Sequence, residues 1–144
     1  NEKSKLLFMM LDVDDFKIVN DTLGHGEGDV VLAKSAKLFT RMLGADSVIG
    51  RVGGDEFAVY RQFTGWTLDN VRKKVDFELK LLNENFDINV AEKYPDCKLS
   101  LSAGVYAVYG ENADDYDSMM KKADIALYNS KRNGKGQYSW FVEN

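Results

Sequence analysis

The chain has 144 residues, of which 44% are hydrophobic and 12% aromatic, which fits one globular domain with a sizeable core and leaves too little chain for a second. Its 19 basic and 23 acidic residues give a net charge of -4, which argues against a non-specific nucleic-acid binder, because such proteins carry a basic excess. Cys97 is the only cysteine and His25 the only histidine, so a disulfide framework and a multi-histidine metal site are excluded.

The longest apolar run, Leu6 to Leu11, is far shorter than the ~20 residues that a membrane helix needs, and no signal-peptide pattern opens the chain. We therefore expect a cytoplasmic domain that makes no membrane contact itself, within a protein that can be membrane-anchored elsewhere. The run continues to Val13 and predicts a central strand buried on both faces. Asp12, at the exit of this strand, is either the N-cap of the next helix or a metal-binding carboxylate.

The apolar residues within 15–23 recur at helical spacing, which predicts a helix that ends at Gly24. Glycines and acids over residues 25–29 break this pattern before a second helix, so two helices joined by a glycine-rich corner are expected. The second helix has an apolar stripe formed by Leu32, Ala36, Phe39 and Leu43. Asp29 is either the N-cap of that helix or a ligand-binding carboxylate.

Residues 48–60 read as a hairpin, with Gly53-Gly54 at a tight turn and Asp55 and Glu56 starting the returning strand. Taken alone, this pattern fits an ordinary Gly-Gly turn followed by solvated acids as well as it fits a functional site. Thr67 can cap a long third helix that ends before the only proline, Pro95. A strand, a polar loop, a helix and a last strand follow, over residues 99–108, 109–115, 119–134 and 137–142. This order predicts an α/β (α+β) domain with one central mixed sheet flanked by helices.

If Asp12, Asp55 and Glu56 converge, three carboxylates crowd one spot, and each like-charge contact near 4 Å costs about 4 kcal/mol at an effective dielectric constant of ~20. Only a cation makes that arrangement stable. Oxygen ligands without histidine or thiolate favour Mg²⁺ or Mn²⁺ over zinc, and such ions commonly bridge carboxylates and substrate phosphates. The predicted chemistry is metal-assisted attack on a phosphate.

Four blocks in a fixed order carry a resemblance to a known family. They are residues 12–21 with Gly24-His25 and Gly28-Asp29, the signature Gly53-Gly54-Asp55-Glu56-Phe57, residues 102–105, and residues 123–131. On these blocks the chain resembles the GGDEF domain of diguanylate cyclases. The resemblance implies a palm-like fold related to nucleotidyl cyclases and polymerases. It also implies that residues 1–144 are a single GGDEF domain that lacks the family's preceding helix and any sensor domain. In the full-length protein, this domain would be fused to a sensor domain.

By resemblance, two metal ions are bound by Asp12, the Val13 carbonyl, Asp55 and Glu56. Asp55 and Glu56 would be the catalytic residues, with Asp55 nearest the role of proton acceptor, although base and metal ligand are hard to separate for adjacent acids. The implied reaction joins two GTP molecules into cyclic di-GMP with release of pyrophosphate. Because each domain holds one GTP, the implied active form is a transient antiparallel homodimer.

The resemblance implies that Asn20 and Asp29 select guanine, with His25 nearby. A carboxylate at Asp29 can accept hydrogen bonds from N1–H and the 2-amino group of guanine, which adenine lacks. On the sequence alone, His25 is more often a turn residue.

The phosphates are expected to meet backbone N–H groups of Asp15, Phe16 and Lys17 at the helix start. Lys131 and Lys135 match positions that contact phosphates, and without the match they read as a solvated basic helix end. The family more often carries arginine at Lys135, so only point-charge contact is expected there.

One departure concerns inhibition by the product. Many members carry an Arg-x-x-Asp inhibitory site shortly before the signature, but the matching tetrad is Gly44-Ala45-Asp46-Ser47, so no product inhibition through that site is expected. Two alternatives to the cyclase stay open. One is a non-catalytic GTP-binding regulatory module, against which the intact Asp55 and Glu56 count, and the other is a related cyclase that also accepts ATP, against which Asp29 counts.

Overall fold

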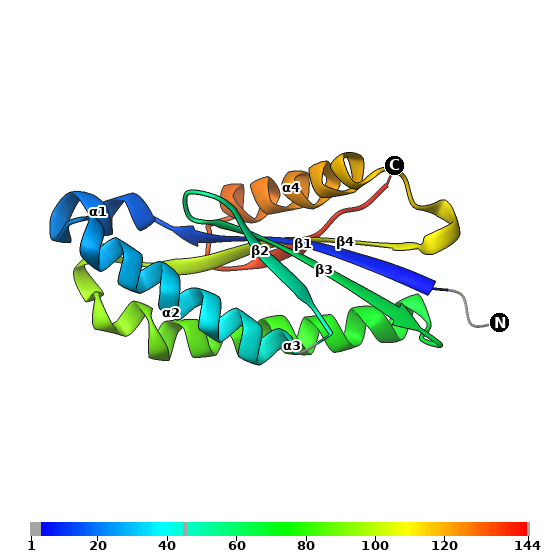
Figure 1. Ribbon diagram of the computed structural model, residues 1–144, viewed down its shortest axis with the longest axis horizontal. Helices are drawn as coiled ribbons and strands as arrows, with labels where there is room; N and C mark the ends of the chain where they lie inside the picture. Colours follow the sequence, from blue (N-terminus) through cyan, green and yellow to red (C-terminus); the bar gives the residue numbers. More distant parts are fainter. Residues whose placement is uncertain (1–3, 45, 144) are drawn as a thin grey trace.

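A computed structural model describes residues 4–44 and 46–143, which form one mixed sheet between helices (Figure 1). Within these residues the sheet has five strands in the order β2-β3-β1-β4-β5. The strands are β1 (Ser4–Asp14), β2 (Val48–Gly53), β3 (Glu56–Thr64), β4 (Ser100–Tyr109) and β5 (Tyr138–Trp140). All neighbouring pairs are antiparallel except β4 and β5, which are parallel. The predicted central mixed sheet flanked by helices is confirmed.

Four α-helices lie within the described residues: α1 (Phe16–Leu23), α2 (His25–Leu43), α3 (Leu68–Asn89) and α4 (Tyr116–Arg132). In Figure 1, α4 covers one face of the sheet, and α2 and α3 lie on the other. No helix in the described part of the chain combines the length and the apolar character that crossing a bilayer demands.

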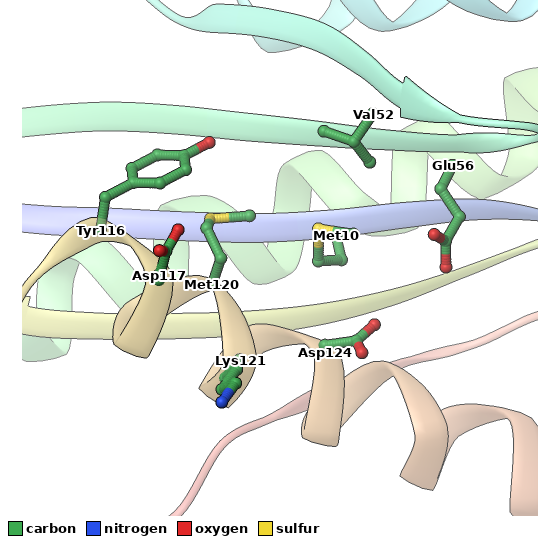
Figure 2. Close-up of a pocket in the computed structure, with 8 residues that line it drawn as sticks. All are labelled: Met10, Val52, Glu56, Tyr116, Asp117, Met120, Lys121 and Asp124. Atoms are coloured by element: carbon green, nitrogen blue, oxygen red, sulfur yellow. The ribbon is translucent and has the colours of Figure 1, made fainter.

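The face under α4 is only partly covered. Phe8, Met10 and Tyr106 of the sheet pack against Ala123 and Leu127 of α4. Toward β2, a pocket of about 420 Å³ lies between the first half of α4 and the hairpin. Figure 2 shows the side chains that line it. This pocket ends at Glu56, so the open part of the face leads toward the predicted site.

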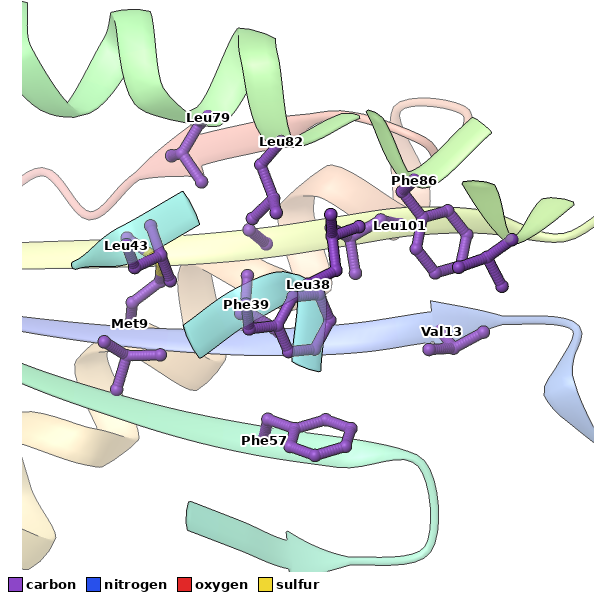
Figure 3. Packing of buried hydrophobic residues seen from close by; sticks show 14 of the residues in the cluster. Met9, Val13, Leu38, Phe39, Leu43, Phe57, Leu79, Leu82, Phe86 and Leu101 are labelled. Carbon is purple, nitrogen blue, oxygen red and sulfur yellow. The ribbon is translucent and has the colours of Figure 1, made fainter. Parts of the chain in front are cut away.

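The opposite face holds the larger core, which α2 and α3 close over the sheet (Figure 3). Met9 and Val13 of β1 point into it, whereas Phe8 and Met10 point to α4, because successive side chains of a strand alternate between faces. The prediction that this strand is buried on both faces is confirmed. The last residues of β1 are therefore held firmly at the edge where α1 begins.

The third helix is confirmed at both ends. Its N-cap Thr67 accepts a hydrogen bond from the backbone N–H of Asn70, and the helix ends at Asn89, before Pro95. Its buried stripe is formed by Val71, Val75, Leu79, Leu82 and Phe86.

The expected glycine-rich corner over residues 25–29 is wrong, because α2 begins at His25. The turn between the two helices is Gly24 alone, at a φ of 93° that favours glycine. Gly28 lies inside α2, where a Cβ would stand 1.9 Å from Oδ1 of Asn20. The glycine therefore permits close contact between α1 and α2. Asp29 is a residue of the first turns of α2, so the alternative that it caps the helix is wrong.

Gly104 marks the closest approach of sheet and helix and provides a stability test. A Cβ on Gly104 would stand 2.1 Å from both the Ala123 carbonyl oxygen and the Leu127 amide nitrogen, which are backbone atoms of α4. Since α4 would have to move, we expect Gly104→Ala to lower the free energy of unfolding by about 3 kcal/mol. Chemical denaturation measures this change.

The matched control is Gly50→Ala in β2, where no atom lies within 4 Å of the added Cβ. We expect that variant to stay within about 1 kcal/mol of the parent. Equal losses in the two variants would contradict close α4 packing as the cause.

Candidate active site

The hairpin is confirmed, but its turn lies one residue later than predicted. β2 includes Gly53, and the turn residues are Gly54, with a φ of 46°, and Asp55, so that only Glu56 starts the returning strand. Nε of Arg51 donates a 2.7 Å hydrogen bond to the Gly54 carbonyl oxygen, which braces the turn. Asp55 is thus free of the strict alternation of a strand.

Sheet pairing brings the hairpin to the end of β1. Asp12 lies directly opposite Glu56 in the register of β1 and β3, and the backbone N–H of Val13 donates to the Asp55 carbonyl oxygen at 3.3 Å. Directly opposite residues of antiparallel strands have Cβ atoms about 5 Å apart on the same face. Two segments more than forty residues apart in the sequence therefore meet at one point.

Asp12 is buried, with 5% of its surface exposed, and is not the N-cap of α1, because that position belongs to Asp15. Its Oδ2 forms an ion pair with Nζ of Lys131 from α4, and its Oδ1 is buried without a hydrogen-bond partner. The pKa of Asp12 is raised to about 7, chiefly by burial and also by the nearby Asp55, while Lys131 opposes the shift. The carboxylate therefore has an unsatisfied oxygen that a cation could bind.

Asp14 belongs to the same cluster, although the sequence did not single it out. Its side chain is fully buried, and Oδ2 accepts hydrogen bonds from the hydroxyls of Ser100 at 2.7 Å and Ser102 at 2.6 Å. Its Oδ1 lies 3.4 Å from Nζ of Lys131. The available signal was the two-residue spacing from Asp12, which puts both acids on the α4 face of β1.

Lys131 and Lys135 both come to the end of β1. Lys131 sits between Asp12 and Asp14, and Nζ of Lys135 lies 3.1 Å from Oδ1 of Asp15. Neither lysine is an isolated, solvated helix end. The acids hold two cationic groups beside the start of α1, where the backbone N–H groups of a helix favour anions.

Of the other residues expected near the phosphates, Phe16 buries its side chain in the core and can offer only its backbone. Lys17 is directed away, with its ammonium 3.7 Å from Asp21 on the exposed side of α1. The expectation that the backbone N–H groups of residues 15–17 meet the phosphates stays a prediction.

The residues expected to select guanine gather at α2. Asp29 lines a pocket of about 390 Å³ between α2 and β2, together with Leu32, Arg51 and Phe57. The Asn20 side chain packs over Gly28, the neighbour of Asp29. His25 is exposed at the first position of α2, four residues before Asp29. The pocket has an apolar wall and a carboxylate, which suits a flat base with hydrogen-bond donors.

Glu56 faces the pocket of Figure 2, into which Asp124 of α4 also points. Burial raises the pKa of Glu56, with further contributions from Asp124 and Asp55, and Lys131 opposes these effects. Asp55 thus lies near both Asp12 and Glu56, and Glu56 also lies near Asp124. Among the described residues, no three His, Cys, Asp or Glu side chains come close enough together to hold a metal ion.

The donor set nevertheless suits a hard cation. It consists of carboxylate oxygens, and the buried Oδ1 of Asp12 lacks a partner. In this arrangement the ammonium of Lys131 balances the charge of Asp12. A metal bound to Asp12 would balance the charge of that carboxylate in place of Lys131. Lys131 would then pair with Asp14 alone.

A family model described as "Diguanylate cyclase, GGDEF domain" matches residues 1–137. The chain belongs to this family. This GGDEF domain is 33% identical over 141 residues to diguanylate cyclase A of Treponema denticola, covering 94% of the chain and 35% of that protein. It is also 32% identical over 142 residues to the cyclic di-GMP phosphodiesterase PdeR of Escherichia coli, covering 98% of the chain and 20% of that protein. The chain therefore spans only about a third or less of these relatives.

The fold comparison agrees with the sequence comparisons. The active GGEEF domain of a diguanylate cyclase from Vibrio cholerae superimposes with a TM-score of 0.76 and 27% identity, over 97% of this chain and 85% of that one. The palm-like fold of this GGDEF domain, expected from the resemblance, is confirmed.

The charge of Asp12 yields a prediction for the metal-free protein. Its pKa rises from 3.8 to about 7 on folding, so the native state binds more protons than the unfolded chain, and stability is lost as the pH rises between these values. Above that range Asp12→Asn removes a buried charge, and we expect a gain of about 1 to 2 kcal/mol, limited because Lys131 loses a partner. Toward pH ~5 the gain should shrink.

Thermal unfolding with a chelator present, in the acidic and the mildly alkaline range, measures this difference. The exposed acid Asp69 of α3 offers a matched control as Asp69→Asn, for which no pH-dependent difference is expected. A loss of stability in Asp12→Asn that is the same at both pH values would show that the native state favours the charged Asp12.

Proposed function

We propose that this GGDEF domain is a diguanylate cyclase that condenses two GTP molecules into cyclic di-GMP. The observation that carries the proposal is the meeting of Asp12, at the end of β1, with the hairpin turn of Asp55 and with Lys131 of α4. The family match and the pocket beside Asp29 support it. In the reaction, the 3′-hydroxyl oxygen of one GTP forms a bond to the α-phosphorus of a second, the bond to pyrophosphate breaks, and the same step is repeated in reverse orientation.

The chain's own groups have distinct roles in this reaction. Asp55, placed in a turn and hence less constrained than a strand residue, is nearest to accepting the 3′-hydroxyl proton, with Glu56 beside it. Lys131, Lys135 and the backbone N–H groups of residues 15–17 hold the phosphates. Asn20, His25 and Asp29 bind the guanine base.

Two ions of Mg²⁺ or Mn²⁺ would be held by Asp12, the Val13 carbonyl, Asp55 and Glu56. Bound there, they would supply positive charge to the α-phosphate and lower the pKa of the attacking hydroxyl. The unbonded Oδ1 of Asp12 supports this assignment. Because Asp12 is buried, the charge of a cation held there would be less screened by water.

The active form is proposed to be a transient antiparallel homodimer, because each domain is proposed to hold one GTP and the reaction needs two facing nucleotides. In a longer protein, a fused sensor domain would control that encounter on the cytoplasmic side of the membrane. The small share of the relatives' length that this domain covers supports such a fusion.

A second candidate is a non-catalytic GTP-binding module that regulates a neighbouring domain. It is favoured by the similarity to a protein named as a phosphodiesterase. The two candidates differ in a single observable, because the module would bind GTP without releasing pyrophosphate.

Asp55→Asn tests the cyclase directly. In an artificially dimerised domain supplied with GTP and Mg²⁺, we expect the variant to lose at least about 100-fold in cyclic di-GMP formation, since a positioned proton acceptor contributes about 10²–10⁴-fold. Chromatography of the nucleotides measures the product. Asp69→Asn is again the control and should retain full activity; GTP binding by the parent domain without any product would instead favour the regulatory module.

Asp29→Asn tests base recognition. An asparagine can accept from only one of the two guanine donors without presenting its own amide hydrogens, so we expect GTP affinity to fall about 10-fold or more. Inosine triphosphate lacks the 2-amino group, and the parent preference for GTP over this analogue should shrink in the variant. Isothermal titration gives both affinities, and an unchanged preference would remove Asp29 from the guanine site.

A further inference from the structure

Asp14 is the most completely buried charged group at the end of β1, and it contacts three separate elements. Two hydroxyl groups of β4, those of Ser100 and Ser102, donate to its Oδ2. The backbone N–H of Gly136, in the loop after α4, donates to the same oxygen at 3.1 Å. Lys131 of α4 faces the other oxygen. Asp14 therefore joins β1, β4 and the end of α4 through one carboxylate.

The loop that Asp14 holds has an unusual backbone. Gly134, Lys135 and Gly136 have successive φ values of 121°, 64° and 63°. A lysine rarely adopts a left-handed conformation, so the surroundings must impose it. The Gly136 N–H also donates to the Ser102 hydroxyl oxygen at 3.0 Å, and the Lys135 N–H donates to the Ser130 carbonyl oxygen at 3.1 Å. These bonds aim the Lys135 side chain at Asp15.

Lys131 is shared between two acids that play different parts. Oδ1 of each acid is buried without a hydrogen-bond partner, and the two acids differ at Oδ2. Oδ2 of Asp12, the acid proposed to hold metal, pairs with Lys131, whereas Oδ2 of Asp14 accepts three hydrogen bonds. A cation on Asp12 weakens the attraction of that acid for Lys131. Asp14 keeps its position, because its hydrogen bonds are to β4 and to the loop after α4. Lys131 would therefore remain beside the β1 end when Asp12 changes partner.

We propose that Asp14 is a positioning residue for phosphate binding, which holds Lys131 by charge and the Lys135 loop by hydrogen bonds. The inference deepens the proposed function and rests on it. Asp14 itself touches no nucleotide, since its side chain is fully buried. It acts through the two lysines, and its removal should affect the triphosphate and not the base.

The test compares two ligands in Asp14→Asn, which keeps the shape of the side chain and one acceptor oxygen but removes the charge. The first ligand is 3′-deoxy-GTP, which has the triphosphate but lacks the attacking hydroxyl, and the second is guanosine. We expect about 10-fold weaker binding of 3′-deoxy-GTP and guanosine binding within about twofold of the parent. Isothermal titration with Mg²⁺ serves for the nucleotide and NMR titration for guanosine.

A double-mutant cycle separates positioning from a general loss of structure. In a Lys131→Met background, Asp14→Asn should weaken 3′-deoxy-GTP binding by no more than about threefold, because the lysine it holds is gone. Ser102→Ala is the milder variant if Asp14→Asn does not fold. It removes one bond to Asp14 and one to Gly136, and we expect about threefold weaker nucleotide binding with guanosine unchanged.

Asp76→Asn is the matched control, since Asp76 accepts a 2.8 Å hydrogen bond from Nε1 of Trp140 away from the site. It should leave both affinities unchanged even where it lowers the melting temperature. Equal weakening of guanosine and 3′-deoxy-GTP by Asp14→Asn, or full additivity with Lys131→Met, would overturn the inference. A parent domain that binds no 3′-deoxy-GTP would overturn the proposed function as well, so the two failures are distinct.

Discussion

The ion pairs of Lys131 with Asp12 and Asp14 are the interaction on which the end of β1 depends. Both acids are almost without exposure, and two buried carboxylates on one face of a strand are tolerable only with a cation nearby. Lys131 supplies that charge from the last turn of α4. It thereby also fastens the helix to the strand at the place where the nucleotide phosphates are proposed to lie. The same contact thus serves the stability of the fold and the charge of the site.

The register of the sheet brings the hairpin turn to the acids at the end of β1. Because Asp12 faces Glu56 across the β1–β3 ladder, the hairpin turn cannot move relative to β1 without disturbing the packing of the core. Phe57, the residue after Glu56, packs edge-on against Phe39 of α2. The turn is therefore anchored on one side by the core and on the other by the bond from Val13 to Asp55. A site built on such rigid elements can hold charged groups close together without relaxing them into solvent.

Burial and function oppose each other at Asp12. Its raised pKa shows that the fold does not favour its charge, and the unbonded Oδ1 is a further cost. Asp14 shows the contrasting solution, in which three donors satisfy one oxygen. Oδ1 of Asp14 is unbonded as well, so the two acids differ at Oδ2, which pairs with Lys131 in Asp12 and accepts three hydrogen bonds in Asp14.

The sequence by itself determined the element types, the hairpin, the apolar stripe of the second helix and the family, because periodicity, turn glycines and motif order are local properties of the chain. It misplaced the start of α2, since Gly26 and Gly28 read as a corner whereas the contact of Gly28 with Asn20 requires a glycine within a helix. It also left Asp14 unnoticed and the meaning of Lys131 open between a solvated helix end and a phosphate contact. The contact of Lys131 with phosphates stays a prediction. Only the tertiary structure showed where α2 begins and that Lys131 pairs with Asp12 and Asp14, because these ion pairs join residues more than a hundred positions apart, and no local pattern records such a pairing.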